Sequence, residues 1–493
     1  MDDLDDDSDT STPTDNEVEE DNVLHQAITL RDFLGGEITA GEELFEISSR
    51  QTVTGMEMWM DVLSVVLKKQ SYSDSRSLEL ACGICANLLL NEFVFEGAIT
   101  LLEHILELLS NSSCTSDPYI ISEILRVFTN LSYKNKGNLL TNSSDILQYT
   151  MYLAENSLSP RVLAQLFQFL YYFQVYSPDS VDILYKTWNS RDFFQFILYN
   201  DADCIVDTSI ATYSNKIIKN KEINTSLIQS LQEEKLGTNN GFEWFLFCLD
   251  HTTTAALSYP VLFSVLHEEY LINICIEMLL STTITSTYND KTILKYSAKL
   301  PNISLQINEI FLVLSILESI GRSYDVQSGS GSSTGTSTGI GNEASIPHFP
   351  GIVLNIVGKY NNFERKGVEV LLLALLEYCE DAVLMRDEYA IVSIAYLVYT
   401  IYSSSDKNTS TSSTVLLRIL NVVEVLELDT SKYWLAETRE NTERITLIVC
   451  MLQVLLHILQ YSYTTSISSS DGIVVNRDKL IKSTLNLINT LKS

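Results

Sequence analysis

The chain has 493 residues with 63 acidic and 32 basic side chains, which leaves a net charge of −31, and 45% of its residues are hydrophobic. This hydrophobic content excludes a wholly disordered protein, and the length suffices for several domains or one extended repeat array. The acidity argues against direct nucleic-acid binding, because phosphate recognition requires clustered lysine and arginine.

Residues 1–24 are predicted to form a disordered acidic tail, because residues 1–22 contain eleven acidic side chains and no basic one. Such a tail either solvates the protein or recruits a basic partner, and it is the opposite of a basic and apolar signal peptide. The longest apolar stretch, 445–459, is too short to span a bilayer, and eight cysteines are too few for a disulfide scaffold. The sequence therefore predicts residence in the nucleus, the cytoplasm or both, without membrane contact.

Helical spacing of apolar residues predicts a series of helices over 25–322, most clearly at 56–174. Two amphipathic helices, 57–69 and 98–109, repeat the i, i+3, i+4, i+7 template, and a weaker one begins at Asp145. Each of them is followed by a polar break and then by a longer, more uniformly apolar helix. This alternation of a short and a long helix is the expected repeating unit.

The longer helices begin at three predicted N-caps, Asp74, Asp117 and Ser159, and a proline at the first helical position follows the last two caps. The caps are 43 and 42 residues apart, a spacing typical of armadillo and HEAT repeats. Such units stack because none can bury its apolar face alone. We therefore expect an all-α, right-handed solenoid of the armadillo/HEAT type with no sheet.

The segment 323–349 is predicted to be a flexible linker or an inserted loop, because residues 328–341 are almost purely glycine, serine and threonine. Beyond Asn200 the repeat period degrades, although helix-length apolar runs continue to the end of the chain. Residues 350–493 are therefore predicted to form further, C-terminal helical repeats.

Cys82 and Cys85 form a CxxC pair, but they lie two turns inside a predicted helix and no second cysteine pair accompanies them. We therefore interpret them as core residues rather than as a redox or zinc site. The six histidines are scattered, and the sequence contains no nucleophile motif and no phosphate-binding glycine loop. The sequence thus predicts no catalytic residue, no metal ligand and no cofactor, and a protein that is not an enzyme.

Seven positions in the first two long helices are shared with a known family. They are Arg76, Glu79, Gly83, Ile84 and Asn87 in the first helix, and Glu123 and Arg126 in the second. With the acidic segment ahead of them, these residues make the region of about 56–135 resemble the serum amyloid A-like family of armadillo-type proteins. The resemblance implies a non-enzymatic α-solenoid of the nucleus or cytosol that acts through protein contacts.

Five residues at corresponding positions of the three long helices are candidates for a partner-binding groove: Asn87, Arg126, Asn130, Gln168 and Tyr172. In armadillo proteins an asparagine at this place can bond the backbone of an extended peptide, and Gly83 would leave space beside Asn87. In the alternative interpretation, the asparagines hold the turns of their own repeat, and Arg126 only pairs with Glu123 one turn earlier.

These features predict a non-catalytic scaffold or adaptor that binds partner proteins, with basic partners among them, along a solenoid surface. Two alternatives stay open: a karyopherin-like transport adaptor for basic cargo, and a regulatory subunit of an enzyme complex. The acidity fits the transport alternative. However, importin-type grooves place a tryptophan four residues before each groove asparagine, and here those positions hold Gly83 and Arg126.

Overall fold

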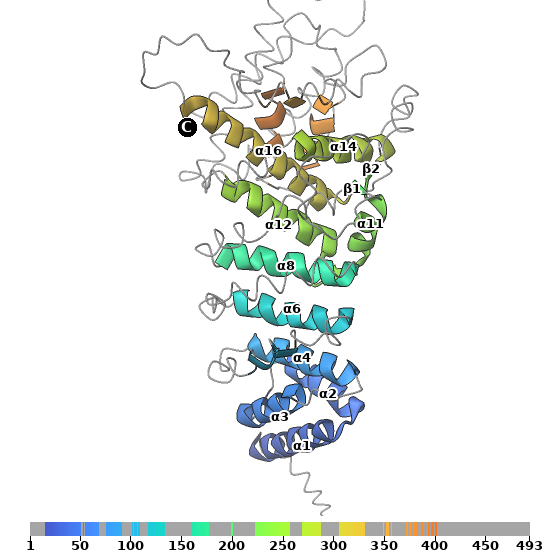
Figure 1. Ribbon diagram of the computed structural model, residues 1–493, viewed down its shortest axis with the longest axis vertical. Coiled ribbons are helices and arrows are strands. Elements are labelled where there is room, and N and C mark those ends of the chain that lie inside the picture. The colour runs from blue at the N-terminus through green and yellow to red at the C-terminus, as the bar shows by residue number, and fades with distance from the viewer. Residues whose placement is uncertain are drawn as a thin grey trace, which may run out of the picture. The chain divides into compact units, whose positions relative to one another are not determined.

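The computed structural model contains two compact units, and the residues that it describes are mostly helical (Figure 1). Unit 1 comprises Met1–Trp188 and Glu233–Trp244, and unit 2 comprises Asn189–Gln232 and Phe245–Ser493. The described residues are 15–50, 53, 55–68, 75–90, 117–133, 159–176, 199–200, 222–256, 269–286 and 305–330, with scattered positions within 101–108 and 349–401.

The helices of unit 1 include the three long helices that the caps predict. Its described elements are α1 (Asp15–Gly35), α2 (Ile38–Ser49), α3 (Met56–Lys68), α4 (Ser75–Leu89), α6 (Pro118–Tyr133), α8 (Pro160–Tyr176), β3 (Lys235–Leu236) and β4 (Asn239–Asn240). Those of unit 2 are β1 (Tyr199–Asn200), β2 (Glu222–Ile223), α14 (Glu269–Ser286) and α16 (Ile307–Ser330). Helices α11 (Thr225–Glu233) and α12 (Gly241–Ala256) cross the division between the units.

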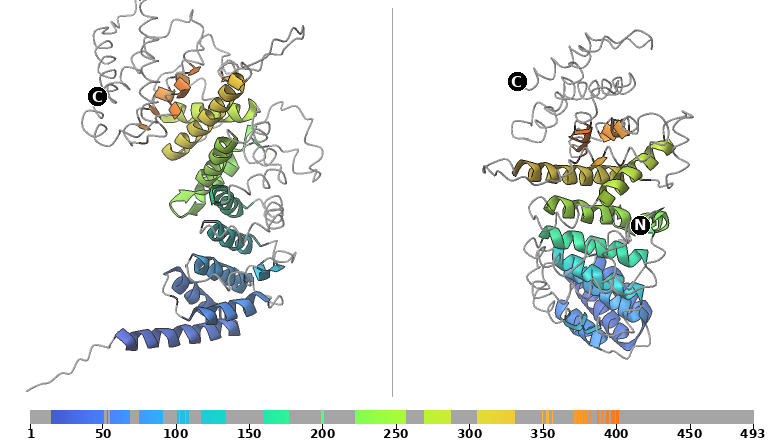
Figure 2. Two further views of the ribbon diagram at one scale, coloured as in Figure 1. Left: turned by 90° about the vertical axis from the view of Figure 1, so that its left-hand side faces the viewer. Right: turned by 45° about the horizontal axis from the view of Figure 1, so that its top comes forward.

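The helices of unit 1 pack in chain order. Helix α1 contacts α2 and α3, helix α4 contacts both of these, and α6 lies between α4 and α8. Helices α4 and α6 run parallel. Arg126 of α6 is hydrogen-bonded to Gly83 of α4, and the later residue Asn130 of α6 is hydrogen-bonded to the later residue Ala86 of α4. In the left view of Figure 2, α6 and α8 are seen nearly along their axes, one stacked on the other. The described part of unit 1 is thus an α-helical, repeat-like stack.

The predicted cap of α6 is present. The Asp117 side chain accepts a hydrogen bond from the Tyr119 backbone N–H at 2.9 Å, which satisfies one of the free amides of the first turn. Before α8, it is the carbonyl oxygen of Ser159 that accepts from the Leu163 N–H, at 3.0 Å. Asp74, the third predicted cap, lies outside the described residues, although α4 begins at the expected place, Ser75.

Helix α1 begins at Asp15, inside the segment 1–24 that composition predicts to be disordered. Acidic side chains are favoured at a helix N-terminus by the helix dipole, so the same charges that suggest disorder also support a helix start. Leu24 is still 61% exposed, whereas Phe33, further along the helix, is buried in the core. Residues 1–14 lie outside the described residues.

Helix α16 extends to Ser330 and thus enters the segment 323–349 for which the sequence predicts a linker. Tyr324 is buried, and its ring centroid lies 6.1 Å from that of Phe349. This aromatic contact within unit 2 extends the apolar packing past the point where composition suggests a linker. The short helix predicted to begin at Asp145 and the helices predicted after residue 401 lie outside the described residues.

Two pairs of two-residue antiparallel strands depart from the expectation of no sheet. Tyr199 pairs with Ile223 between β1 and β2, and Lys235 pairs with Asn240 between β3 and β4. Gly237, with φ of 71°, forms the turn between β3 and β4 in a backbone conformation that glycine adopts readily. Strands of two residues show no alternation of apolar and polar side chains, so a search for periodicity overlooks them.

Cys82 and Cys85 form no disulfide and are fully buried in α4, which confirms their assignment to the core. Burial raises the pKa of the Cys85 thiol to about 12, because the thiolate would lose its hydration. This thiol is therefore protonated and unreactive in the folded protein at neutral pH.

In unit 2, α14 packs against α16, and a carboxylate of α16 joins two further side chains. Glu318 accepts hydrogen bonds from Arg322 Nε at 2.6 Å and from the Ser393 hydroxyl.

On α12, burial raises the pKa of Asp250 to about 6, and its Oδ1 atom is buried without a hydrogen-bond partner.

Within the described ranges, none of the helices combines the length and the apolar character that crossing a bilayer requires.

Candidate partner-binding site

A narrow row of half-buried residues crosses α4, α6 and α8. Between Ile120 and Ser132 of α6, only Arg126 and Asn130 reach solvent, and every other residue is buried. On α8 the corresponding positions hold the half-buried Gln168 and Tyr172. On α4, Asn87 is half-buried but Gly83, which corresponds to Arg126, is buried. We call the half-buried residues the accessible stripe: Asn87, Arg126, Asn130, Gln168 and Tyr172. All five positions predicted from the sequence thus belong to one accessible row.

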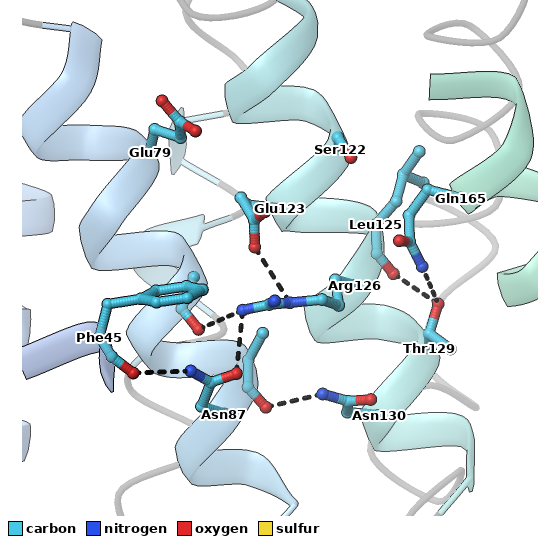
Figure 3. A network of polar contacts seen from close by, with 12 residues as sticks. Phe45, Glu79, Asn87, Ser122, Glu123, Leu125, Arg126, Thr129, Asn130 and Gln165 are labelled. Atoms are coloured by element: carbon cyan, nitrogen blue, oxygen red, sulfur yellow. Dashed lines mark hydrogen bonds and ion pairs between the residues drawn. The ribbon is translucent and has the colours of Figure 1, made fainter. Parts of the chain in front are cut away.

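Arg126 is the centre of a polar network between α6 and α4 (Figure 3). Its Nη2 atom donates to the Gly83 carbonyl oxygen at 2.6 Å and to Asn87 Oδ1 at 3.0 Å. Its Nε atom lies 3.0 Å from Glu123 Oε2 in an ion pair that is not aligned for a hydrogen bond. The guanidinium also stacks over Phe45 of α2, 5.3 Å from the ring centroid. Arg126 therefore joins three helices and does more than pair with Glu123.

The space beside Gly83 that the sequence suggests for a ligand is occupied by Phe45. A Cβ atom at position 83 would lie 2.7 Å from Phe45 Cε2, too close for any side chain without a shift of the ring. Glycine at this position therefore allows α2 to approach α4, and the Phe45 ring becomes the surface on which Arg126 rests.

The two asparagines of the stripe are bonded to the preceding helix. Asn87 Nδ2 donates to the Phe45 carbonyl oxygen at 3.3 Å and to Ser48 Oγ at 3.0 Å, both on α2. Asn130 Nδ2 donates to the Ala86 carbonyl oxygen at 2.7 Å on α4 (Figure 3). Each amide thus bonds a neighbouring repeat rather than a turn of its own, and a role in partner binding stays a prediction.

Glu123 is the buried acidic group of this network, and two arginines share it. Besides Arg126, Arg161 of α8 lies 3.5 Å from Glu123 Oε1. Burial raises the pKa of Glu123, while the two guanidiniums act in the opposite direction. Burial likewise lowers the pKa of Arg126, against the effect of Glu123. The pair is therefore held in a weakly hydrated position where each charge depends on the other.

Gln168 takes part in a second, smaller network on α8. The buried Gln165 donates from Nε2 to Gln168 Oε1 at 2.6 Å and to the Thr129 hydroxyl of α6 at 3.2 Å. Gln168 is thus linked through Gln165 to Thr129 of α6.

Tyr172 belongs to an aromatic group that we call the tyrosine cluster: Tyr133, Tyr171, Tyr172, Tyr176 and Trp244. The ring centroid of Tyr172 lies 5.4 Å from that of Tyr133, 6.0 Å from that of Tyr176 and 5.5 Å from that of Trp244. Trp244 is 6% exposed, Tyr133 is 45% exposed, and the other tyrosines are half-buried. The cluster is therefore an aromatic surface with a buried base.

Sequence reasoning placed Tyr172 on the stripe but missed Tyr133, Tyr176 and Trp244. A signal was available for the first two, because Tyr133 and Tyr176 are the last residues of α6 and α8 and the repeat period brings these ends together. Trp244 had no such signal, since it is far along the chain from the repeats that it contacts.

The chemistry of the site is that of amide, guanidinium and phenol groups. Across the residues that the structure describes, no group of three histidine, cysteine, aspartate or glutamate side chains could hold a metal ion.

No protein-family model and no curated protein matches this sequence. Among solved structures, the chain is similar to the structure of the TSC2 N-terminus, with 11% sequence identity and a TM-score of 0.27. That similarity covers 87% of this chain and 99% of the other. A likeness of this size establishes no shared family and no shared function.

Proposed function

We propose that the protein is a non-catalytic scaffold or adaptor that binds partner proteins along the accessible stripe. The repeats are proposed to continue as a right-handed armadillo/HEAT-type solenoid, as the resemblance to the serum amyloid A-like family implies. The observation that supports the proposal is the burial pattern of α6, where Arg126 and Asn130 alone reach solvent between Ile120 and Ser132. A partner that contacts the body of this helix on its accessible face meets the stripe.

The composition of the stripe suits protein recognition. Arginine and tyrosine are enriched among the residues that dominate binding energy at protein interfaces. Arg126 and Asn130 are already held by internal hydrogen bonds, so a partner would not have to order them on binding. The five residues of the stripe include no nucleophile paired with a base, and a binding role therefore explains them better than catalysis does.

The test is partner binding by stripe variants of the full-length protein. A double variant, Gln168→Glu with Tyr172→Ala, changes two half-buried positions on α8. The control, Tyr119→Ala, changes a tyrosine that is 52% exposed at the opposite end of α6. Proteins captured from the native cells by the wild type are purified, and their affinities for all three forms are measured by titration calorimetry.

We expect at least one partner to bind the double variant about tenfold more weakly, which corresponds to about 1.4 kcal/mol, and to bind the control like the wild type. Melting temperatures of the three forms should agree within a few degrees. Equal affinity for all three forms, or the absence of any specific partner, would contradict the proposed function.

A further inference from the structure

The tyrosine cluster lies where two parallel helices end. Tyr133 is the last residue of α6, Tyr176 is the last residue of α8, and Tyr172 stands one turn earlier on α8. The rings of Tyr133 and Tyr176 are 5.6 Å apart between centroids and nearly perpendicular, at 89°. Ring faces and edges from both helices are therefore gathered at the same end of the stack, next to the last backbone carbonyls of each helix.

Three electrostatic features of this place favour a cation. The C-terminus of a helix carries partial negative charge, and neither α6 nor α8 has a basic residue in its last turn, although Lys134 follows α6 directly in the sequence. The faces of aromatic rings are negative as well, and the chain as a whole carries a net charge of −31. Burial, with smaller effects from the neighbouring tyrosines, raises the pKa of Tyr172, so its ring stays neutral at physiological pH.

The arginines of these two helices are engaged away from the cluster. Arg126 rests on Phe45 and bonds Gly83, and Arg161 stacks over Tyr119 at the opposite end of α6, with 5.0 Å between the guanidinium carbon and the ring centroid. The pairing of Arg161 with Tyr119 shows the kind of contact that a guanidinium makes with an exposed tyrosine of this stack.

From this geometry we infer that the tyrosine cluster binds an arginine side chain presented by an extended segment of a partner protein. A guanidinium can stack flat on a tyrosine ring and at the same time donate in its plane to carbonyl oxygens at a helix end, which an ammonium or an apolar side chain cannot do. The inference rests on the proposed function and specifies the chemistry of the partner at this end of the stripe.

The test uses the full-length protein and a fluorescent heptapeptide of alternating glycine and arginine. The comparison peptide replaces each arginine by citrulline, which keeps the planar shape but carries no charge. Binding is followed by fluorescence anisotropy at about 0.3 M salt, where long-range attraction to the acidic chain is largely screened.

Three variants accompany the wild type. Tyr133→Leu with Tyr172→Leu removes two rings but keeps apolar volume. Tyr133→Phe with Tyr172→Phe keeps the rings, and Tyr119→Leu is the matched control on the same helix. Circular dichroism verifies that each variant is folded, and the comparison of the two peptides on the wild type does not depend on any substitution.

We expect the arginine peptide to bind the wild type about tenfold more tightly than the citrulline peptide, since the cation–π attraction is lost with the charge. The leucine variant should lose most of this preference, and the phenylalanine and Tyr119 variants should keep it. Equal binding of the two peptides, as an apolar or proline-rich occupant would imply, overturns the inference. An equal loss of the preference for the arginine peptide in the leucine variant and in the Tyr119 variant also overturns the inference. If cellular partners still depend on the stripe in that case, the proposed function stands and only the arginine assignment fails.

Discussion

Replacing Arg126 by alanine should destabilise unit 1 strongly, because this side chain joins α6 to α4 and α2. The substitution removes the hydrogen bonds to Gly83 and Asn87, at 2.6 and 3.0 Å, and the stacking on Phe45. It also leaves the Glu123 carboxylate, whose side chain is 9% exposed, with a single cationic neighbour at 3.5 Å.

The expected cost follows from these contacts. Hydrogen bonds from a charged donor contribute about 1.5 to 3 kcal/mol each, and breaking a buried ion pair by removal of one partner costs about 3 to 5 kcal/mol. These contributions overlap, so they cannot simply be added. The Arg126 side chain is also 27% exposed, and solvent screening reduces the energy of both the hydrogen bonds and the ion pair. We therefore expect the free energy of unfolding to fall by about 3 kcal/mol. In a Glu123→Gln background the cost should be smaller by about 1 to 2 kcal/mol, since no buried charge is then left unpaired.

The assay is urea unfolding of the full chain by circular dichroism, with hydrogen exchange measured by mass spectrometry to localise the loss to α4 and α6. Arg161→Ala is the matched control. It removes a cation from the same carboxylate, but this arginine is 39% exposed and 3.5 Å away, so its loss should cost less than about 1 kcal/mol. Similar costs for the two arginines, or unchanged exchange in α4, would refute the role assigned to Arg126.

Two further predictions concern packing and pH. Gly83→Ala should lower the free energy of unfolding by about 1 to 3 kcal/mol in thermal unfolding, because its methyl group would meet Phe45 at 2.7 Å. The control is Gly35→Ala, whose methyl group would have nothing within 4 Å and which should be neutral or stabilising. Equal effects of the two substitutions would contradict the close approach of Phe45 to Gly83. Asp250→Asn should stabilise unit 2 near pH 7.5 by up to about 3 kcal/mol, because burial raises the folded pKa of Asp250 from 3.8 to about 6 and its charged form opposes folding. The stabilising contribution of protonated Asp250 is complete below pH 3.8 and is lost as the pH rises through about 6. The gain in unfolding free energy of the Asp250→Asn variant should therefore shrink as the pH falls toward about 4. A gain that does not change with pH would contradict the raised pKa of Asp250.

Local features of the sequence predicted helices α3, α4, α6 and α8 of unit 1. Asp117 followed by proline marks the start of α6, and the apolar spacing around Trp59 and Leu63 marks the buried face of α3. The burial of Cys82 could also be foreseen from its apolar neighbours in α4. Capping and periodicity act over a few residues, so they can be read without knowledge of the fold.

What each exposed side chain of the stripe contacts was decided by tertiary structure. The sequence placed Asn87 and Asn130 in one row and Arg126 in a parallel row one turn earlier, but their partners include backbone carbonyl oxygens 42 to 44 residues away. Every residue has a backbone carbonyl oxygen, so the residue type does not indicate which carbonyl will accept a hydrogen bond from these side chains. The tyrosine cluster depends in the same way on stacking, because the ends of α6 and α8 meet only when the helices run parallel and in register. The sequence by itself therefore determined the helical spans of α4, α6 and α8 and the half-buried positions of the stripe, and packing decided which of those residues hold the repeats together.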